Sequence, residues 1–300
     1  MKVTDYIAEN RFVTIVELLP PKKLNLDKLE KSVASLQPLC DFISLTSKKE
    51  AYACTSLDTA ASLSVRHTVE TKFLAHITIM EFGEIRELPF IRILGSSNFG
   101  IENFLVMRGD GEYHGGSYRY SSDLVRAIHD MNMGVDPYGR QCTPTDFCIG
   151  AVVSQYKNRD KELEIARVKR ENGADFFITQ MCFDPFWEGE TNKYSYTQFR
   201  KDLHEFLGED VPVIAGVPIP DRSTINFVKS KKGEDPMYFP GALEERLNSA
   251  SEDQEERIKV AQEILVYLRD VAKAPGVDVF TIGKAKLARK VLDGVSVEKV

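Results

Sequence analysis

The sequence has little of several features that mark particular protein classes. Its five cysteines are odd in number and include no CxxC pair, which argues against a disulfide framework and against a zinc cluster. No apolar run approaches the length of a membrane span, and residues 1–10 hold no signal-peptide core. Positive charge is not in excess, since the formal net charge is −6. We therefore expect a cytoplasmic protein that binds neither nucleic acid nor membrane.

Motifs of several enzyme classes are also absent. The sequence contains no P-loop, no GxGxxG after an expected strand and no GxSxG elbow. No two histidines share a helix face, and His76 has no partner of ligand type close to it in the sequence. We therefore expect no metal site and no Ser-His-Asp triad.

What the chain does contain is a regular alternation of two patterns. Short apolar runs of the kind found in strands buried on both faces are followed by segments with helical periodicity. The expected strands are 12–16, 41–46, 72–78, 103–107, 147–153, 176–180, 211–216 and 277–281. The expected helices are 26–36, 56–68, 84–94, 122–131, 161–171, 196–207, 224–232, one or two within 244–272, and 284–292.

Eight strand–helix units without a low-complexity linker predict an α/β protein with the (β/α)8 barrel fold. We expect one catalytic domain over residues 1–300, in which residues 1–11 form a short N-terminal extension. A doubly wound parallel sheet is the alternative. The number of units and the length favour the barrel, which usually takes about 250 residues.

In such a barrel the active site lies at the carboxyl ends of the strands. The polar residues expected there are Glu17, Thr46, His76, Thr78, Arg108, Asp110, Gln180 and Lys284. Glu17 lies between Val16 and Leu18, so partial burial should raise its pKa and suit it to act as a general acid. Asp110 lies near Arg108 and between two glycines, which should keep it ionised.

These residues and their neighbours resemble the methylenetetrahydrofolate reductase family, the flavin-dependent (β/α)8 enzymes of one-carbon metabolism. The similar segments keep the family's order, and the Arg-Gly-Asp and Gly-Ala-Asp…Ile-Thr-Gln segments are the most specific. They are Val16 to Lys22, His76 to Thr78, Leu105 to Asp110, Tyr120 to Leu124, Gly173 to Asp184, and Pro212 to Val217.

The resemblance implies the reduction of 5,10-methylenetetrahydrofolate to 5-methyltetrahydrofolate, with NADH or NADPH as hydride donor and a flavin as carrier. The family usually binds FAD, and FMN is the alternative flavin. By resemblance Glu17 is the general acid, Asp110 lies between flavin and pterin, and Gln180 binds the pterin. Lys284 takes the place of a basic residue that meets the folate tail. The positions that match flavin contacts are Thr46, His76, Arg108, Gly109, Asp110, Tyr120, Ala151 and Lys169.

Two loops depart from the family pattern. Val152-Val153-Ser154-Gln155 stands where the family usually has an aromatic-Pro-Glu segment, and Ser47-Lys48-Lys49-Glu50 replaces a glycine-rich turn. With these changes, the protein could use another electron donor, or it could run the reaction in the oxidative direction in methyl-group catabolism. They also leave open a non-catalytic homologue that serves as a subunit of a larger oxidoreductase complex. We expect a homo-oligomer, with a partner electron-transfer subunit as a further option.

Overall fold

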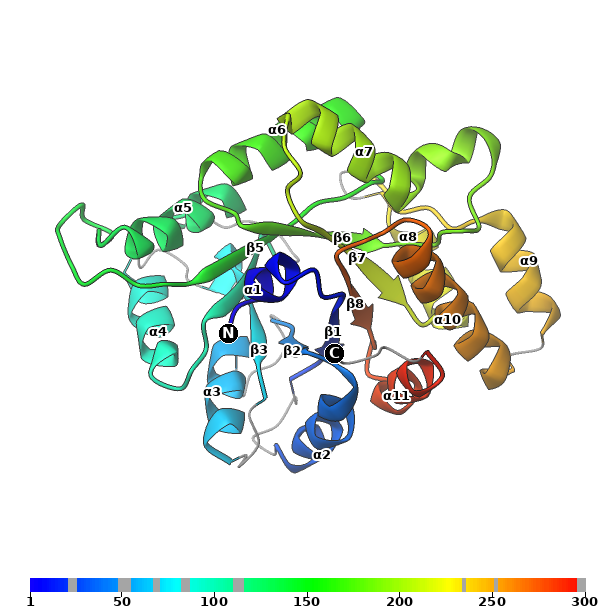
Figure 1. The fold of residues 1–300 in the computed structure, drawn as a ribbon, viewed down its shortest axis with the longest axis horizontal. Coiled ribbons are helices and arrows are strands. Elements are labelled where there is room, and N and C mark those ends of the chain that lie inside the picture. The colour runs from blue at the N-terminus through cyan, green and yellow to red at the C-terminus, as the bar shows by residue number, and fades with distance from the viewer. Residues whose placement is uncertain are drawn as a thin grey trace.

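The computed structural model confirms the (β/α)8 barrel. It describes residues 1–20, 26–47, 55–66, 71–81, 87–109, 116–233, 236–250 and 253–295. Eight parallel strands close into a barrel in chain order, and helices surround them (Figure 1). The strands are β1 (Val13–Leu18), β2 (Phe42–Leu45), β3 (Phe73–Thr78), β4 (Asn103–Met107), β5 (Cys148–Val152), β6 (Phe176–Met181), β7 (Val213–Pro218) and β8 (Gly276–Phe280).

The helices fall close to their predicted positions, apart from an additional one at the N-terminus. They are α1 (Val3–Ala8), α2 (Asp27–Leu36), α3 (Ser56–Arg66), α4 (Leu88–Ser97), α5 (Ser121–Asn132), α6 (Arg159–Glu171), α7 (Tyr196–Leu207), α8 (Arg222–Ser230), α9 (Gly241–Ser249), α10 (Gln254–Asp270) and α11 (Ala285–Asp293). Short 3-10 turns are η1 (Gln37–Leu39), η2 (Ile79–Glu81) and η3 (Gly189–Tyr194). The helix expected to begin at Glu84 begins at Leu88, because Pro89 is favoured in a first turn. Residues 84–86 lie outside the described residues.

The strands are apolar on both faces because one face lines the barrel interior and the other meets the helices. The interior cluster is Val13, Ile15, Phe42, Leu74, Leu105, Cys148, Phe176, Ile178 and Ile214, joined by Val3 and Tyr6 of α1. The interior residues Glu17, His76 and Asp278 are polar, and the candidate site lies there.

Residues 1–11 are more than an extension. Helix α1 lies over the centre of the barrel in Figure 1, and Val3 and Tyr6 are buried against the interior cluster. The Val3 amide donates to Asn103 Oδ1 at 2.9 Å, which ties α1 to β4. This helix closes the amino end of the barrel, so the site must open at the other end.

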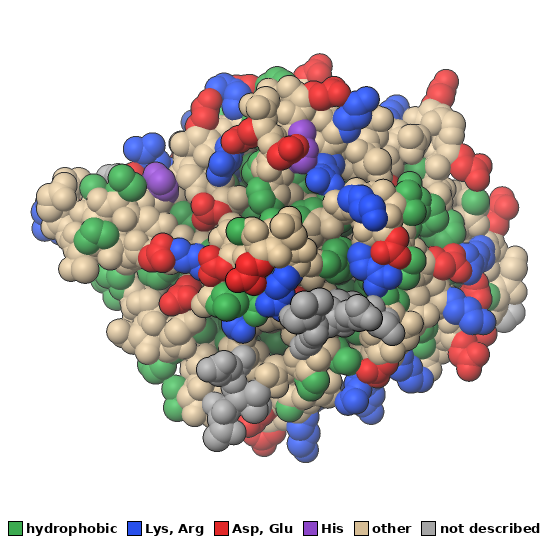
Figure 2. Space-filling view, viewed as in Figure 1, with side chains coloured by type: hydrophobic (Ala, Val, Ile, Leu, Met, Phe, Trp, Pro, Cys, Tyr) green, Lys and Arg blue, Asp and Glu red, His purple; other side chains and the backbone are tan. Residues whose placement is uncertain are grey.

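The surface on the α1 side carries both signs of charge, intermixed over the helices (Figure 2). Cys40, Cys142, Cys148 and Cys182, the cysteines in the described ranges, form no disulfide with one another. Among the helices that the structure describes, none is both long enough and apolar enough to cross a membrane.

Candidate active site

Two carboxyl groups from neighbouring strands point into the upper part of the barrel. Glu17 is the penultimate residue of β1 and is partly buried, while Asp278 is the central residue of β8 and is fully enclosed at 0% exposure. The strand register pairs Asp278 with Ile15, two residues before Glu17, so Asp278 lies one interior layer deeper. Glu17 faces the mouth and Asp278 lies beneath it.

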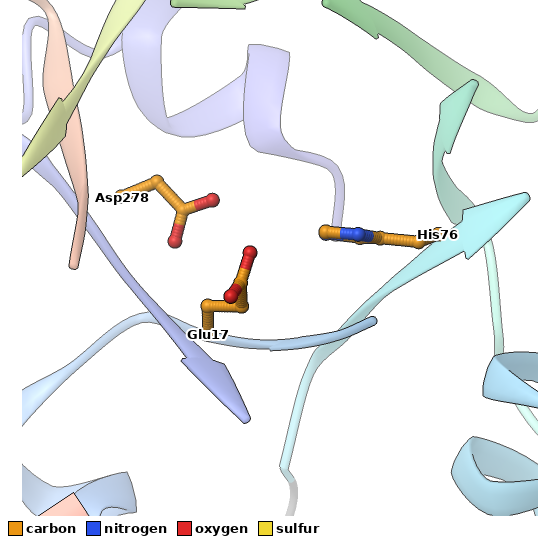
Figure 3. A group of neighbouring side chains, drawn as sticks. All are labelled: Glu17, His76 and Asp278. Carbon is orange, nitrogen blue, oxygen red and sulfur yellow. The ribbon is translucent and has the colours of Figure 1, made fainter. Parts of the chain in front are cut away.

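His76 of β3 completes this cluster. One ligand-type atom each of Glu17, His76 and Asp278 lies within 4.8 Å of the others, and their polar ends point toward one another (Figure 3). The Nε2 atom of His76 is 2.6 Å from the hydroxyl of Ser44, on the intervening strand β2. Burial lowers the pKa of His76 to about 3, so its imidazole is neutral and adds no positive charge to the two carboxyl groups.

Asp278 lacks the partners that a buried carboxylate needs. Among the described residues, neither of its oxygens has a hydrogen-bond partner. Burial, and then the neighbouring Glu17, raise its pKa well above the usual range. Asp278 is therefore a protonated carboxylic acid at neutral pH, because an unpaired buried charge would be very costly.

The cluster differs from the sequence analysis in two respects. The statement that His76 has no ligand-type partner near it holds along the chain but is wrong in space, because β1 and β8 bring two carboxyl groups to it. The sequence analysis did not include Asp278 among the site residues, although a charged residue between Val277 and Val279 in an expected strand could have pointed to it. Helices cover the outer face of β8, so a charged residue on an alternating strand had to face the interior.

The rim beside this cluster is formed by the ends of β2, β3 and β4. Thr46 follows β2, and its amide donates to the carbonyl of Leu18 at 3.1 Å, which places it beside the end of β1. Arg108 is exposed at the end of β4, and Gly109 follows it with φ of +89°. A Cβ on Gly109 would lie 3.0 Å from Thr78 Cβ, so this turn packs directly on the end of β3. Asp110, the second predicted catalytic residue, lies outside the described residues.

Comparison with known proteins assigns this barrel to a family. The sequence model of methylenetetrahydrofolate reductase matches residues 2–296. The chain belongs to the methylenetetrahydrofolate reductase family. Methylenetetrahydrofolate reductase 2 of Schizosaccharomyces pombe strain 972 is 24% identical over an alignment of 168 residues that covers 53% of this chain. The match spans 25% of that relative's length, so this chain covers only a part of it.

A solved structure supports the fold. A Clostridium thermocellum protein that binds two copies of 5-methyl-5,6,7,8-tetrahydrofolic acid aligns with a TM-score of 0.55 at 14% identity. The alignment covers 96% of each chain. At this identity the likeness shows that the two chains share the barrel fold.

The reductase family implies a flavin, and the rim fits one in part. The predicted contacts Thr46, Arg108 and Gly109 follow the ends of β2 and β4, and His76 lies buried within the intervening β3, so the four residues belong to three consecutive strands. Thr46 Oγ1 is buried and has no hydrogen-bond partner among the described residues, which leaves a polar atom at the rim for a ligand to satisfy. These residues would hold the flavin against the side of the barrel formed by β2 to β4.

The remaining predicted flavin contacts are not placed as side-chain contacts at the mouth. Tyr120 is exposed at the start of α5, and the methyl group of Ala151 packs between the barrel and the helices. The amine of Lys169 is buried and donates to the carbonyl of Val152 at 2.7 Å. Burial lowers its pKa to about 8, against the opposing attraction of Glu162. Ala151 could meet a flavin only through its backbone, and Lys169 only after leaving Val152.

The two predicted folate-binding residues lie at the rim on the other side. Gln180 is exposed near the carboxyl end of β6, within a register irregularity between Ile178 and Met181. Lys284 follows β8 and forms an ion pair with Asp221, which precedes α8. The structure therefore puts Glu17, Gln180 and Lys284 at the carboxyl ends of their strands. Of these, Lys284 is already paired with Asp221.

Proposed function

We propose that this chain is a flavin-dependent methylenetetrahydrofolate reductase that converts 5,10-methylenetetrahydrofolate to 5-methyltetrahydrofolate with NADH or NADPH. The observation that carries the proposal is Glu17, which lies at the mouth of a reductase-family barrel with a protonated second carboxyl beneath it. The Clostridium thermocellum neighbour supports the substrate class, because the methylfolate that it binds is the product of this reaction.

The chain's own part in the reaction is proton transfer and positioning. When bound, a flavin supplies the hydride chemistry between the nicotinamide and the folate carbon. Glu17 donates a proton to the folate ring nitrogen, which opens the five-membered ring to a reducible iminium. Gln180 holds the pterin, and Lys284 attracts the anionic tail as a point charge, without the two-pronged geometry of arginine.

One observation favours the alternative of a partner-dependent subunit without this activity. Beside β5, the Gln155 amide donates to the carbonyl of Met181 at 3.0 Å, and Lys169 donates to Val152. The loop that departs from the family pattern is thus tied to β6 and α6, although Gln155 Oε1 is buried without a hydrogen-bond partner among the described residues. A subunit of this kind would bind an oxidoreductase partner through the barrel rim and would take up neither flavin nor folate.

The absorption spectrum of the purified protein separates the two functions. The proposal predicts flavin bands that bleach anaerobically with NADH or NADPH and return when methylenetetrahydrofolate is added. Ferredoxin as donor, and methyltetrahydrofolate as reductant of the oxidised flavin, test the other electron donor and the oxidative direction. A colourless protein that takes up neither FAD nor FMN would exclude the reductase and support the subunit.

Glu17→Gln tests the proton donor. The amide keeps the size of the side chain but has no acidic proton, so folate reduction should fall by about 10² to 10⁴-fold. Flavin reduction by the nicotinamide needs no acid and should stay within about twofold of the wild-type rate. Stopped-flow absorbance measures the two half-reactions separately. An equal loss in both would refute the assigned role.

A further inference from the structure

Three side chains that carry metal-ligating atoms meet inside the barrel. Glu17 of β1, His76 of β3 and Asp278 of β8 each place one such atom within 4.8 Å of the other two (Figure 3). All three strands belong to one closed sheet, which holds side chains in place more precisely than loops do. The sequence shows no metal-ligand spacing for this cluster because its members come from three separate strands.

Asp278 is the member of this cluster that most needs a ligand. It is at 0% exposure, and neither of its carboxyl oxygens has a hydrogen-bond partner among the described residues. Burial and the neighbouring Glu17 act on the pKa of Asp278, and both oppose its ionisation. A carboxyl group buried in this way is stable only when it carries a proton or binds a cation.

The separations within the cluster suit a bridging cation. Because the three ligand atoms lie within 4.8 Å of one another, the centre of the smallest circle around them is within about 2.8 Å of each. Zinc binds imidazole nitrogen and carboxylate oxygen at about 2.0–2.2 Å, so each atom has to move by less than about 1 Å. The Glu17 carboxylate has two oxygens, so a neighbour that contacts one of them leaves the other for the cation.

His76 supplies the nitrogen that selects the kind of metal. Its imidazole is buried and neutral, so it offers a lone pair. Its Nε2 atom lies 2.6 Å from the hydroxyl of the buried Ser44 on β2, and metal-ligating histidines usually have such a hydrogen-bond partner to orient the ring. One imidazole and two carboxylates favour zinc over magnesium, which prefers oxygen ligands alone.

We propose that Glu17, His76 and Asp278 bind one divalent metal ion of the zinc type, and that the bound ion prevents proton donation by Glu17. The metal site stands by itself, whereas the inhibition rests on the proposed function.

Metal and proton exclude each other at this site. Without a cation, Asp278 keeps its proton and Glu17 is free to act as the acid. A ligating carboxylate must be deprotonated, so the cation takes the place of the Asp278 proton, which passes to solvent. The bound dication also holds Glu17 in its ionised form, so no proton reaches the folate ring nitrogen.

Calorimetric titration of chelator-treated protein with Zn²⁺, without flavin or folate, tests the site. Wild type should take up one Zn²⁺ per chain and bind Mg²⁺ more weakly. Ser44→Ala removes only the hydrogen bond to His76 and should weaken zinc binding by about 10–100-fold. Asp278→Asn retains the shape of the side chain but removes an anionic ligand, so the loss should be larger than in Ser44→Ala.

Asp210→Asn is the matched control. Asp210 is 94% exposed and lies 2.9 Å from Nδ1 of His204, so this pair offers zinc a histidine and a carboxylate at the surface. Its loss should leave the tight zinc site unchanged. Nitrogen-15 NMR of the histidine rings in wild type serves if Asp278→Asn does not fold. One equivalent of zinc should shift the signals of His76 and leave those of His204 in place.

The inhibition is measured separately in the flavin-loaded enzyme. Zinc should slow the folate half-reaction, and a chelator should restore its rate. Flavin reduction by the nicotinamide needs no acid and should stay within about twofold of the zinc-free rate. Zinc that occupies the site but leaves the folate half-reaction of an active enzyme unchanged would refute the inhibition.

Several outcomes would overturn the metal site. Wild type that takes up no stoichiometric zinc would do so, as would magnesium binding as tight as zinc binding. Zinc binding that Asp278→Asn leaves unchanged would show an adventitious ion only. If wild type lacks the folate half-reaction while its zinc binding is lost in Asp278→Asn, the proposed function fails and the metal site stands.

Discussion

At the scale of single residues, the turn after β4 depends on Gly109. Its φ of +89° is costly for any residue with a side chain, and an added Cβ would also meet Thr78 and Met80 at 3.0–3.2 Å. We expect Gly109→Ala to lower the free energy of unfolding by about 1–3 kcal/mol and to weaken flavin binding through the neighbouring Arg108. Urea denaturation and a flavin titration measure the two effects.

Gly139→Ala is the matched control for this turn. Gly139 has φ of +79°, but an added Cβ there would meet nothing within 4 Å. The control therefore carries the backbone strain, about 1–2 kcal/mol, without the collision. Equal losses in the two variants would show that contact with β3 does not constrain Gly109.

The residues of the site differ in how far they could be predicted. The position of Glu17 at the mouth was predictable, because it follows an apolar run that ends in two prolines. The pairing with Asp278 was not, since it depends on the closure of β8 onto β1 and on a register that shifts the two residues by one layer. Sequence spacing carries no information about such a contact between residues 17 and 278.

At the scale of elements, two loops at the rim hold each other through Lys284 and Asp221. Partial burial would raise the pKa of Asp221, but the ion pair with Lys284 and hydrogen bonds from Ser223 and Thr224 hold it well below its usual range. We expect Asp221→Asn to free Lys284 for the folate tail and to lower the KM for folate several-fold. Asparagine still caps α8, so the free energy of unfolding should fall only by the lost ion pair, about 1–3 kcal/mol.

Lys284→Met is the reciprocal variant. It removes the charge that attracts the anionic tail and should raise the KM for folate, with little change in kcat. Steady-state kinetics at low and high salt checks both variants, because screening should narrow the difference between them. If neither variant alters KM, the tail does not reach Lys284.

Helix α1 is an element that sequence patterns underestimated. Tyr6 is 5% exposed, packs edge-on against Phe42 with ring centroids 5.4 Å apart, and lies under Arg11 at 4.0 Å. Tyr6→Ala should lower the free energy of unfolding by about 3 kcal/mol, because it leaves a cavity under the barrel. Tyr138→Ala, at a 58% exposed position, should cost less than about 0.5 kcal/mol. Similar losses would mean that α1 does not close the barrel.

The strands were predictable because each is an apolar run buried on both faces and is followed by turn residues. The missed α1 has only six residues, too few for a helical period to show, and is stabilised by its contact with the barrel. The observed helix ends differ from the predicted ones where a proline or a capping residue sets the end of the helix, as at Leu88. Local pattern thus indicated the elements, and tertiary contact added the closing helix.

At the scale of the whole molecule, buried acids make stability depend on pH. Asp278 and Glu81 have raised pKa values, so the native protein holds protons that the unfolded chain releases. Stability should therefore be greatest in mildly acidic solution and fall toward alkaline pH. The usual ion-paired carboxylates, such as Asp221, act in the opposite direction and set the acid limit.

Glu81 at the end of η2 gives this dependence a defined pH range. Burial raises its pKa to about 8 against the attraction of Arg92, which is paired with Asp58 at 2.8 Å. Between about 4.5 and about 8 the native state keeps this proton, so stability falls by up to about 1.4 kcal/mol per pH unit. Glu81→Gln carries no charge at any pH, so its free energy of unfolding relative to wild type should rise across that range. The exposed Glu205→Gln should show no such rise. Urea denaturation at several pH values measures the difference, and a constant gap between Glu81→Gln and wild type would show that Glu81 is ionised in the native state.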